Sequence, residues 1–522
     1  MLQKKLTHYY KKIIFFLILC IGPFAFNYHY GFIGLMPMDN TVLFNGGYRV
    51  LNGYVPFSDY WLVTGPLLDY INAFFFKLLG VSWSTFIIHS SIFNSLIAIA
   101  SYFFFKKMDL SSLFSLIYAL LLSFLFYPVV GTPFVDHHST FFLILAFFCL
   151  MLAVKTNNEN YYLFIPTILS LSFLSKQTPA AYGIIIIPFI ILFISFFKRK
   201  ERKEIIKKTL IGTIYGLSFI LIFFFITKIK FNFFFDQYIV FASSIGEDRL
   251  TNYSFNFFNE LVKYKFISYF LLVLVFILIK LKLNKKLNLN TLIIIVTCIV
   301  LSIILIFHQI LSLNQNFIFF LIPFLSGVIH SYYKKVLNKK YFLIITFLIC
   351  ILGVGKYHLR FNEERKFNEL ENIDISKAVD AKILNEKLAG LKWITYIKPV
   401  TPHEELNNLL EVMNIYSQDK AKKLLITEYQ IIAPILNIYD NSPNQWHHPS
   451  VSFPLRGNKH FKMYKDYFIA HIKKNKIDFI YETREDNKTI TRLILNPSCI
   501  NQNRVGKMLI KIELMKNCED LQ

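Results

Sequence analysis

The chain has 522 residues and a formal net charge of +23, and 55% of its residues are hydrophobic, including 57 phenylalanines. A soluble protein of this length would divide into several domains and would not carry so much apolar residue. The positive charge by itself would suit a nucleic-acid-binding protein, but the lysines and arginines gather in short loops between apolar blocks, which argues against that class.

Apolar blocks follow one another from the N-terminus to Val354. Hydrocarbon about 30 Å thick takes about 20 helical residues to cross, and somewhat fewer with interfacial flanks. The blocks therefore predict a polytopic α-helical membrane protein with about eleven spans. They cover residues 13–26, 83–105, 110–126, 140–154, 161–174, 183–197, 210–226, 266–281, 292–307, 317–329 and 341–354.

The basic residues cluster in alternate loops, at residues 4–12, 106–107, 198–208, 280–286 and 334–340. Retained cationic loops mark the cytoplasmic side, so we expect a cytoplasmic N-terminus. No small-residue cleavage site follows the first block, which indicates an uncleaved first span. Eleven spans then place the C-terminal region outside. We predict a transmembrane domain over residues 1–356 and an extracytoplasmic domain over residues 357–522.

The first external loop, residues 28–82, carries two predicted helices. Asn40 could cap a helix over residues 41–52, with Gly53 as its C-terminal stop. A second helix is expected between Pro66 and Gly80, where apolar residues recur at the helical period. It is too short to span comfortably, so we expect an amphipathic helix lying along the membrane surface.

The C-terminal region returns to a mixed composition with short apolar runs. Thr401-Pro402-His403-Glu404 matches a capping box at the start of a helix. Residues 423–427, 477–481 and 508–514 are typical of buried strands, and residues 460–474 of a helix. This alternation predicts a small α/β domain. Cys499 and Cys518 could form a disulfide there or remain two free thiols.

Polar residues converge at the external ends of the predicted spans. They are Asp39, Asp136, His137, His138, Lys176, Gln177 and the segment 309–316. Ionisable groups near a membrane interior are costly, so several on one side suggest a shared cavity that would hold both Asp39 and Lys176. The alternative is that each is a solvated interfacial residue. For Lys176 this alternative is weaker, because positive charge is normally depleted on that side.

The stretch from Met38 to Gly80 resembles the first external loop of bacterial GT-C glycosyltransferases. The similar positions are Asp39, the turn Gly53-Tyr54-Val55-Pro56-Phe57-Ser58-Asp59, then Gly65-Pro66-Leu67-Leu68-Asp69-Tyr70, and Gly80. Phe57 and Gly65 replace a usual tyrosine and proline. "LSKQTPAAYG" around Lys176 is also similar to an external turn of these enzymes. Members of the superfamily include the aminoarabinose transferase of lipid A, protein O-mannosyltransferases and lipopolysaccharide core transferases.

The resemblance implies an enzyme that transfers a sugar from a polyprenyl-phosphate donor, with Asp39 as general base and inversion at the anomeric carbon. A phosphate leaving group departs as an anion, so the site needs a base for the acceptor and cations or donors for the phosphate. Lys176 is the first candidate for the phosphate and Arg49 the second, while Gln177 can donate a hydrogen bond.

Asp136, His137 and His138 are expected to contact sugar or acceptor. Some relatives bind a divalent metal, and Asp136 and His137 are weak candidates for its ligands, because adjacent residues rarely all reach one ion. No cofactor is otherwise implied. Asp59 is a candidate substrate-binding residue, although Asp59 and Asp69 could instead tie the loop turn and cap the second helix.

The sequence thus predicts a glycosyltransferase at the outer face of a bacterial cytoplasmic membrane. Its acceptor would be lipid A, lipopolysaccharide core, a surface glycan or a protein, and no nucleic acid is expected as a partner. Two alternatives are a transporter or flippase for a lipid-linked glycan and a non-catalytic membrane scaffold. A transporter would need charges at mid-membrane depth or a repeated broken helix pair, and neither is visible in the sequence.

Overall fold

The computed structural model describes residues 2–253, 256–312, 316–336, 340–483 and 490–515, and its elements divide into two compact units. The first unit comprises Met1–Gly31, Ile87–Phe223 and Arg249–Phe367. The second comprises Phe32–Phe86, Phe224–Asp248 and Asn368–Gln522. The sequence predicts two domains that are each one continuous stretch of chain, with the boundary after residue 356. In the structure, residues 32–86, most of the predicted first external loop, are instead grouped with the C-terminal region.

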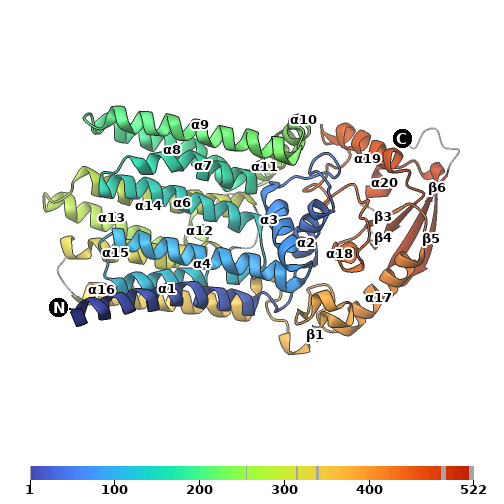
Figure 1. Cartoon of the computed structure of the whole chain (residues 1–522), viewed down its shortest axis with the longest axis horizontal. Helices are drawn as coiled ribbons and strands as arrows, with labels where there is room; N and C mark the ends of the chain where they lie inside the picture. Colours follow the sequence, from blue (N-terminus) through green and yellow to red (C-terminus); the bar gives the residue numbers. More distant parts are fainter. Residues whose placement is uncertain (1, 254–255, 313–315, 337–339, 484–489, 516–522) are drawn as a thin grey trace. The chain divides into compact units, whose positions relative to one another are not determined.

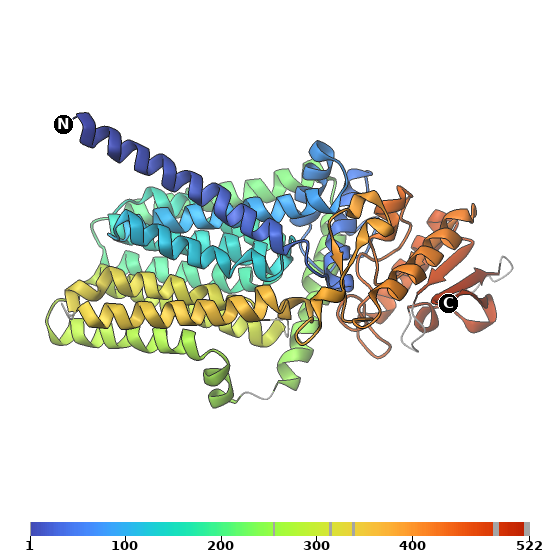
Figure 2. The same cartoon turned by 90° about the horizontal axis from the view of Figure 1, so that it is seen from below.

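The first unit is a bundle of long helices that lie roughly side by side (Figure 1, Figure 2). The helices that lie wholly or mainly in it are α1 (Leu2–Tyr30), α4 (Trp83–Lys107), α5 (Ser112–Phe124), α6 (Val135–Thr156), α7 (Asn160–Ser175), α8 (Gln177–Phe197), α9 (Arg202–Thr227), α12 (Phe257–Lys263), α13 (Lys265–Leu283), α14 (Leu289–Ser312), α15 (Leu321–Val336) and α16 (Lys340–His358).

Within the described residues, nine helices are long and apolar enough to cross a membrane, and the chain is therefore a multi-pass membrane protein. All eleven apolar blocks are helical. The two that fall short are α7, which has 16 residues and contains Pro166, and the apolar helix Ile318–Tyr333. The polytopic fold predicted from the sequence is confirmed, and the length of these two helices explains the difference in number.

In the second unit, α2 (Pro37–Leu51) and α3 (Leu67–Leu79) form a tightly packed pair. A Cβ atom on Gly46 would lie 2.2 Å from Asp69 Oδ1, and one on Gly47 would lie 2.4 Å from the Cβ of Asn72. Real Cβ atoms do not approach other atoms so closely, so these two glycines are what lets α2 pack directly on α3.

The predicted cap at Asn40 is wrong. The helix begins three residues earlier, at Pro37, and the Asn40 side chain lies inside it and accepts a hydrogen bond from the Met36 N–H at 2.8 Å. Proline suits the first helical position because its missing N–H would be unpaired there in any case. The C-terminal stop is confirmed, since the helix ends at Leu51 and Gly53 has a φ of +86°. The predicted second helix is confirmed as α3.

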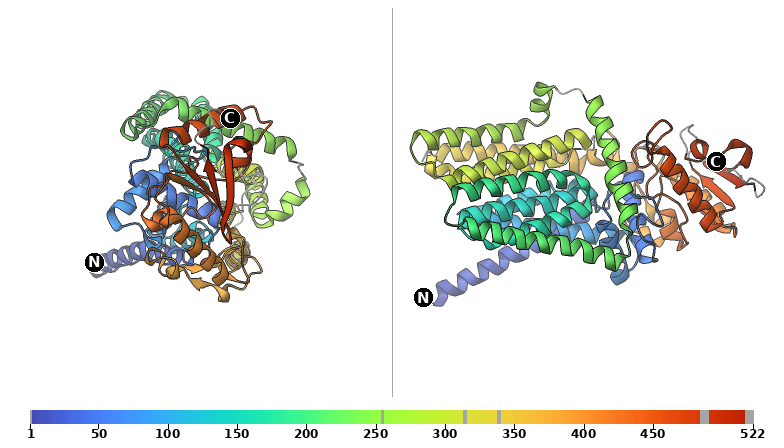
Figure 3. Two further views of the ribbon diagram at one scale, coloured as in Figure 1. Left: turned by 90° about the vertical axis from the view of Figure 1, so that its right-hand side faces the viewer. Right: turned by 90° about the horizontal axis from the view of Figure 1, so that it is seen from above.

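The C-terminal part of the second unit has a four-stranded sheet in the order β3-β4-β6-β5. β3 (Lys423–Ile426) and β4 (Phe479–Glu482) are parallel, while β6 (Leu509–Leu514) runs antiparallel to both β4 and β5 (Ile500–Gly506). The strands appear as red and orange arrows in Figure 3. The remaining elements of the unit are α10 (Phe231–Phe234), α11 (Ala242–Asn252, shared with the first unit), α17 (Pro402–Gln418), α18 (Ile432–Leu436), α19 (Phe461–Asn475), α20 (Ile490–Ile494) and the strand pair β1 (Val379–Asp380) and β2 (Lys392–Trp393).

The hydrophobic core of the second unit explains its composition. Leu424 and Ile480 from the sheet and Phe468 from α19 cluster with Trp61 of residues 32–86 and Phe241 of residues 224–248. The backbone N–H of Trp61 also donates to the Pro443 carbonyl at 2.7 Å. Burial of large aromatic side chains is a dominant favourable contribution to packing. It joins these segments although they are far apart in the sequence.

The predicted strands 423–427, 477–481 and 508–514 and the helix 460–474 are confirmed as β3, β4, β6 and α19. The helix predicted to follow Thr401 is confirmed as α17, but Thr401 makes no capping bond to the backbone, and its hydroxyl instead bonds Glu404 Oε2 at 3.1 Å. Cys499 is disulfide-bonded. Cys518, considered as a possible partner from the sequence, lies outside the described residues.

Candidate functional site

A buried charged centre lies in the first unit, where α6, the junction of α7 and α8, and α14 meet. Asp136 is in the first turn of α6 and is 1% exposed. The Lys176 ammonium donates to both carboxylate oxygens of Asp136, at 2.7 Å each. Lys176 has an extended backbone between the end of α7 and the start of α8, so it belongs to neither helix. Of the residues expected to share a cavity, Asp136 and Lys176 are thus in direct contact, while a cavity that holds both Asp39 and Lys176 stays a prediction.

Polar contacts between α6 and α7 hold this junction in place. The Ser172 hydroxyl donates to the Ser139 carbonyl at 2.7 Å, and the Ser139 hydroxyl donates to the Lys176 carbonyl at 3.3 Å. The Lys176 side chain keeps 17% of its surface exposed, whereas Asp136 is enclosed. A lysine fixed by a buried carboxylate and still partly accessible can hold an anion at a defined position.

Two further residues join this centre that the sequence did not single out. His308, on α14, lies with its Nε2 2.8 Å from Asp136 Oδ1, and because a carboxylate only accepts, Nε2 carries the hydrogen. Arg249 donates to the Ser312 carbonyl at 2.7 Å and interacts electrostatically with Asp136. Burial lowers the pKa of Arg249, and the Asp136 carboxylate partly offsets this shift. The centre therefore carries two cations, one anion and a histidine.

His137 and His138 point to different surroundings. The His137 ring stacks on Phe317 with 4.2 Å between the ring centroids, and neither of its nitrogens has a hydrogen-bond partner at ordinary geometry among the described residues. His138 is fully buried between the Nε2 of His89, at 2.9 Å, and the hydroxyl of Tyr127, at 2.7 Å. His138 is thus held inside the bundle, and its expected contact with sugar or acceptor has no geometric support.

The structure does not fit the metal site considered for Asp136 and His137. Both oxygens of Asp136 accept from Lys176, and one also contacts His308. Within the ranges that the structure describes, there is no group of three or more His, Cys, Asp or Glu residues arranged to hold a metal ion. We assign no metal to this centre.

Asp39 lies in the first turn of α2 in the second unit. It is half-buried, and its backbone N–H donates to the Met36 carbonyl at 3.1 Å. A carboxylate in the first helical turn is favoured by the unpaired N–H groups and the positive end of the helix dipole. Asp39 thus lies at the positive end of the α2 dipole. Gln177, the other expected polar partner, is the first residue of α8 in the first unit and is also half-buried.

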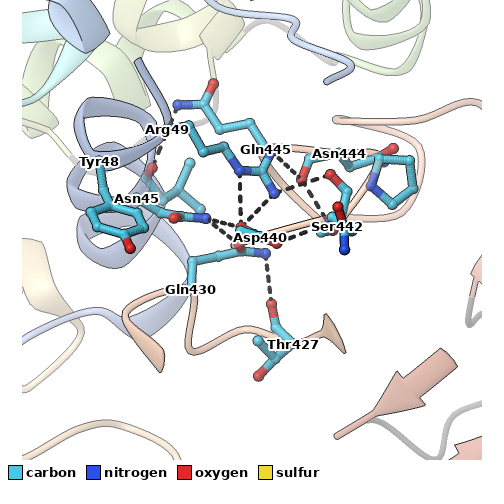
Figure 4. A network of polar contacts seen from close by, with 12 residues as sticks. Asn45, Tyr48, Arg49, Thr427, Gln430, Asp440, Ser442, Asn444 and Gln445 are labelled. Carbon is cyan, nitrogen blue, oxygen red and sulfur yellow. Dashed lines mark hydrogen bonds and ion pairs between the residues drawn. The ribbon is translucent and has the colours of Figure 1, made fainter. Parts of the chain in front are cut away.

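Arg49 does not lie where a phosphate ligand needs it. The guanidinium is fully buried and donates to Asp440 Oδ2 through Nε, at 2.9 Å, and Nη2, at 2.6 Å (Figure 4). It also donates to the carbonyls of Ser442 and Asn444. Burial alone would lower the pKa of Arg49, but the Asp440 carboxylate outweighs it and raises this pKa. Arg49 therefore ties α2 to residues 440–444.

Asp59 and Asp69 also hold the fold of the second unit together. Asp59 Oδ2 accepts from the Val55 N–H at 2.9 Å and closes the turn, and its other oxygen pairs with Lys474 at 3.2 Å. Asp69 is buried on α3 and accepts from the Tyr60 hydroxyl at 2.8 Å and from Gln445 Nε2 at 2.9 Å. These contacts support a structural role for both residues, but Asp69 does not cap α3, which has no side-chain cap at its N-terminus.

The apolar helices and the buried Asp136–Lys176 pair show a multi-pass membrane protein with a charged centre inside its helix bundle. Residues 63–227 match the family model of dolichyl-phosphate-mannose-protein mannosyltransferases. This match supports a membrane glycosyltransferase of the GT-C type. No curated protein sequence matches the chain.

The matched segment covers less than half of the chain. It contains α3 to α9 and therefore Asp136, His137, His138, Lys176 and Gln177. Asp39, Arg49, Asp59, Arg249 and His308 lie outside it. The resemblance seen in the sequence lies mainly in residues 38–80, and the family match overlaps it from residue 63 onward and continues through the helices that follow.

Proposed function

We propose that the protein transfers a sugar from a polyprenyl-phosphate donor to a hydroxyl of a cell-envelope acceptor, with inversion at the anomeric carbon. The acceptor class is lipid A or lipopolysaccharide core, a surface glycan or a protein. The reaction would take place at the outer face of a bacterial cytoplasmic membrane. The observation that carries the proposal is the Lys176 ammonium, fixed by the buried Asp136 carboxylate and still partly exposed, within the segment that matches the mannosyltransferase family.

The chemistry of a phosphate leaving group suits this centre. The bond between the sugar and the phosphate breaks, a bond from the acceptor oxygen to the anomeric carbon forms, and negative charge collects on the departing phosphate. Lys176 would neutralise that charge, and Asp136 would hold the ammonium in place through two hydrogen bonds. Arg249 adds a second cation, and His308 fixes Asp136 from the other side.

Asp39 would accept the proton of the acceptor hydroxyl. Its half-buried position in the first turn of a helix, near the positive end of the helix dipole, would favour the ionised form that a base must have. Its position in the loop that resembles other GT-C enzymes supports this role. Asp59 in the same loop is bound by the Val55 N–H and by Lys474, which makes it a matched carboxylate without the proposed role.

The substitution Asp39→Asn should remove most of the transfer, because general-base catalysis is worth roughly 10²–10⁴-fold in rate. Cell-envelope glycans are compared by mass spectrometry in four strains: wild type, deletion, Asp39→Asn and Asp59→Asn. We expect the glycan that is lost in the deletion strain to stay absent with Asp39→Asn and to return with Asp59→Asn. Full restoration by Asp39→Asn would show that Asp39 is not the base.

Lys176→Gln should both weaken binding of the donor and slow turnover, because the ammonium would contact the phosphate before transfer and neutralise the charge that collects on it. A charge-assisted hydrogen bond to an anion contributes about 1.5–3 kcal/mol, so we expect the KM for a polyprenyl-phosphate sugar to rise by roughly 10–100-fold. The purified enzyme is assayed in liposomes with this donor, and His330→Gln, on α15 of the same unit, serves as control. A KM and a kcat that both stay close to the wild-type values would contradict a role for Lys176 at the phosphate.

A further inference from the structure

A surface groove of about 600 Å³ runs along one face of α9 in the first unit. None of the residues that line it belongs to the Asp136 centre. Its lining comes from α9 alone and includes Arg202, Lys203 and Lys207 at one end, followed by Ile206, Leu210 and Ile214. Neither the family match nor the proposed transfer reaction gives this groove a role.

Packing on the opposite side of α9 fixes which face carries the groove. Gly212 and Gly216 are buried, and a Cβ on Gly212 would lie 2.4 Å from the Leu163 carbonyl oxygen of α7. One on Gly216 would lie 3.1 Å from the Pro166 carbonyl oxygen. Leu210 and Ile214 each lie two residues from Gly212, about 200° around a helix, so they face away from α7.

This outward face meets lipid. α9 is one of the helices long and apolar enough to span a membrane, and only 17% of its most apolar stretch is buried within the protein. Leu210 and Ile214 are 58% and 61% exposed. Since a span carries such residues on its surface only where hydrocarbon covers them, the apolar part of the groove lies against acyl chains.

The basic end of the groove is only weakly neutralised by protein. Lys207 lies 3.8 Å from Glu204, and both side chains are more than half exposed, so this pair contributes little. Arg202 and Lys203 make no ion pair within the part of the chain that the structure describes. Arg202, Lys203 and the weakly paired Lys207 therefore lie beside the start of an apolar strip. A phospholipid has the complementary arrangement, with a charged headgroup next to its acyl chains.

We infer that this groove, which we call the α9 groove, binds an anionic phospholipid of the surrounding leaflet. Its phosphate would lie among Arg202, Lys203 and Lys207, and an acyl chain would lie along Ile206, Leu210 and Ile214. Net negative charge on the headgroup is required, because a zwitterionic headgroup brings its own cation to the same place. The site is independent of the proposed transfer reaction.

The test uses the full chain in nanodiscs and measures bound lipid by native mass spectrometry with phosphatidylglycerol, phosphatidylcholine or polyprenyl phosphate as the probe. The variant Arg202→Gln/Lys203→Gln/Lys207→Gln removes the charges of the groove. The control Lys280→Gln/Lys282→Gln/Lys285→Gln removes the same charge near the end of α13. We expect the groove variant to lose about 10–100-fold in affinity for phosphatidylglycerol and the control to stay close to wild type.

A second variant separates shape from charge. Leu210→Trp keeps every cation but fills the apolar part of the groove, and we expect it to weaken phosphatidylglycerol binding about tenfold. Equal losses in the groove variant and the α13 control would show general attraction to an anionic surface and overturn the inference. Unchanged binding in both triple variants would overturn it too, as would a wild-type preference for phosphatidylcholine or for polyprenyl phosphate.

Discussion

Asp69 shows how one residue couples the packing of the second unit to pH. Burial raises the pKa of this carboxyl from its ordinary value of 3.8 to about 7, although hydrogen bonds from Tyr60 and Gln445 act in the opposite direction. Between these two pH values the folded protein holds a proton on Asp69 that the unfolded chain has lost. The free energy of unfolding should therefore fall as the pH rises from about 4 to about 7.

Asp69→Asn should remove this contribution, because an amide does not titrate. We expect the difference in melting temperature between the wild type and Asp69→Asn to change in favour of the variant as the pH is raised from 5 to 8. Thermal unfolding of the purified protein, followed at several pH values, measures it. Tyr60→Phe removes a hydrogen bond that lowers the Asp69 pKa, so its transition should move to higher pH. Parallel curves for wild type and Asp69→Asn would contradict the assignment.

The sequence predicted some of the candidate site at this scale and missed the rest for physical reasons. A lysine on the side where positive charge is expected to be depleted marks Lys176 as a candidate, but its pairing with Asp136 does not follow from the sequence, because the two residues lie 40 positions apart. His308 ends an apolar helix and has no local pattern that marks it. Arg49 was interpreted as a phosphate ligand because its counter-ion Asp440 lies 391 positions away, and no local pattern announces such a pairing.

At the scale of elements, the α2–α3 pair depends on two adjacent glycines. Gly46→Ala would place a methyl group 2.2 Å from both Asp69 Oδ1 and Gln445 Nε2. These atoms are buried and hydrogen-bonded to each other, so they cannot simply move away. The two helices must separate instead, which opens the contacts around Arg49 as well.

We expect Gly46→Ala to lower the free energy of unfolding by about 1–3 kcal/mol, the usual cost of overpacking. The matched control is Gly246→Ala on α11, where an added Cβ has nothing within 4 Å. There the substitution should be neutral or stabilising by about 0.5–1 kcal/mol, because alanine favours a helix over glycine. Chemical denaturation of both variants in the same detergent gives the comparison. Equal effects would mean that the close approach of α2 and α3 is not limiting.

Elements with a clear apolar period were predicted, and those without one were not. The spans, α3, α17, α19 and three strands follow from their sequence patterns. β5 was missed because it is an edge strand whose residues are almost all exposed, so its sequence INQNRVG has no alternation of polar and apolar residues. The start of α2 was misplaced because Asn40 is as good a cap in isolation as Pro37 is a first residue.

At the scale of the whole molecule, the sequence indicated the membrane region and the α/β region but not how the chain is shared between the two units. Composition changes near residue 356, which suggested a single boundary. The structure groups residues 32–86 and 224–248 with the C-terminal region, because Trp61 and Phe241 pack with the sheet core. Such grouping depends on contacts between distant segments and leaves no mark in local composition.

The Arg49–Asp440 pair has a consequence for how the protein is made. A ribosome adding about 5–20 residues per second needs roughly 20–80 s to pass from one partner to the other. During that interval α2 has left the ribosome while the carboxylate that neutralises its arginine does not yet exist. The second unit must therefore complete its fold late, and a chain cut short before Asp440 would expose that arginine to quality-control proteases.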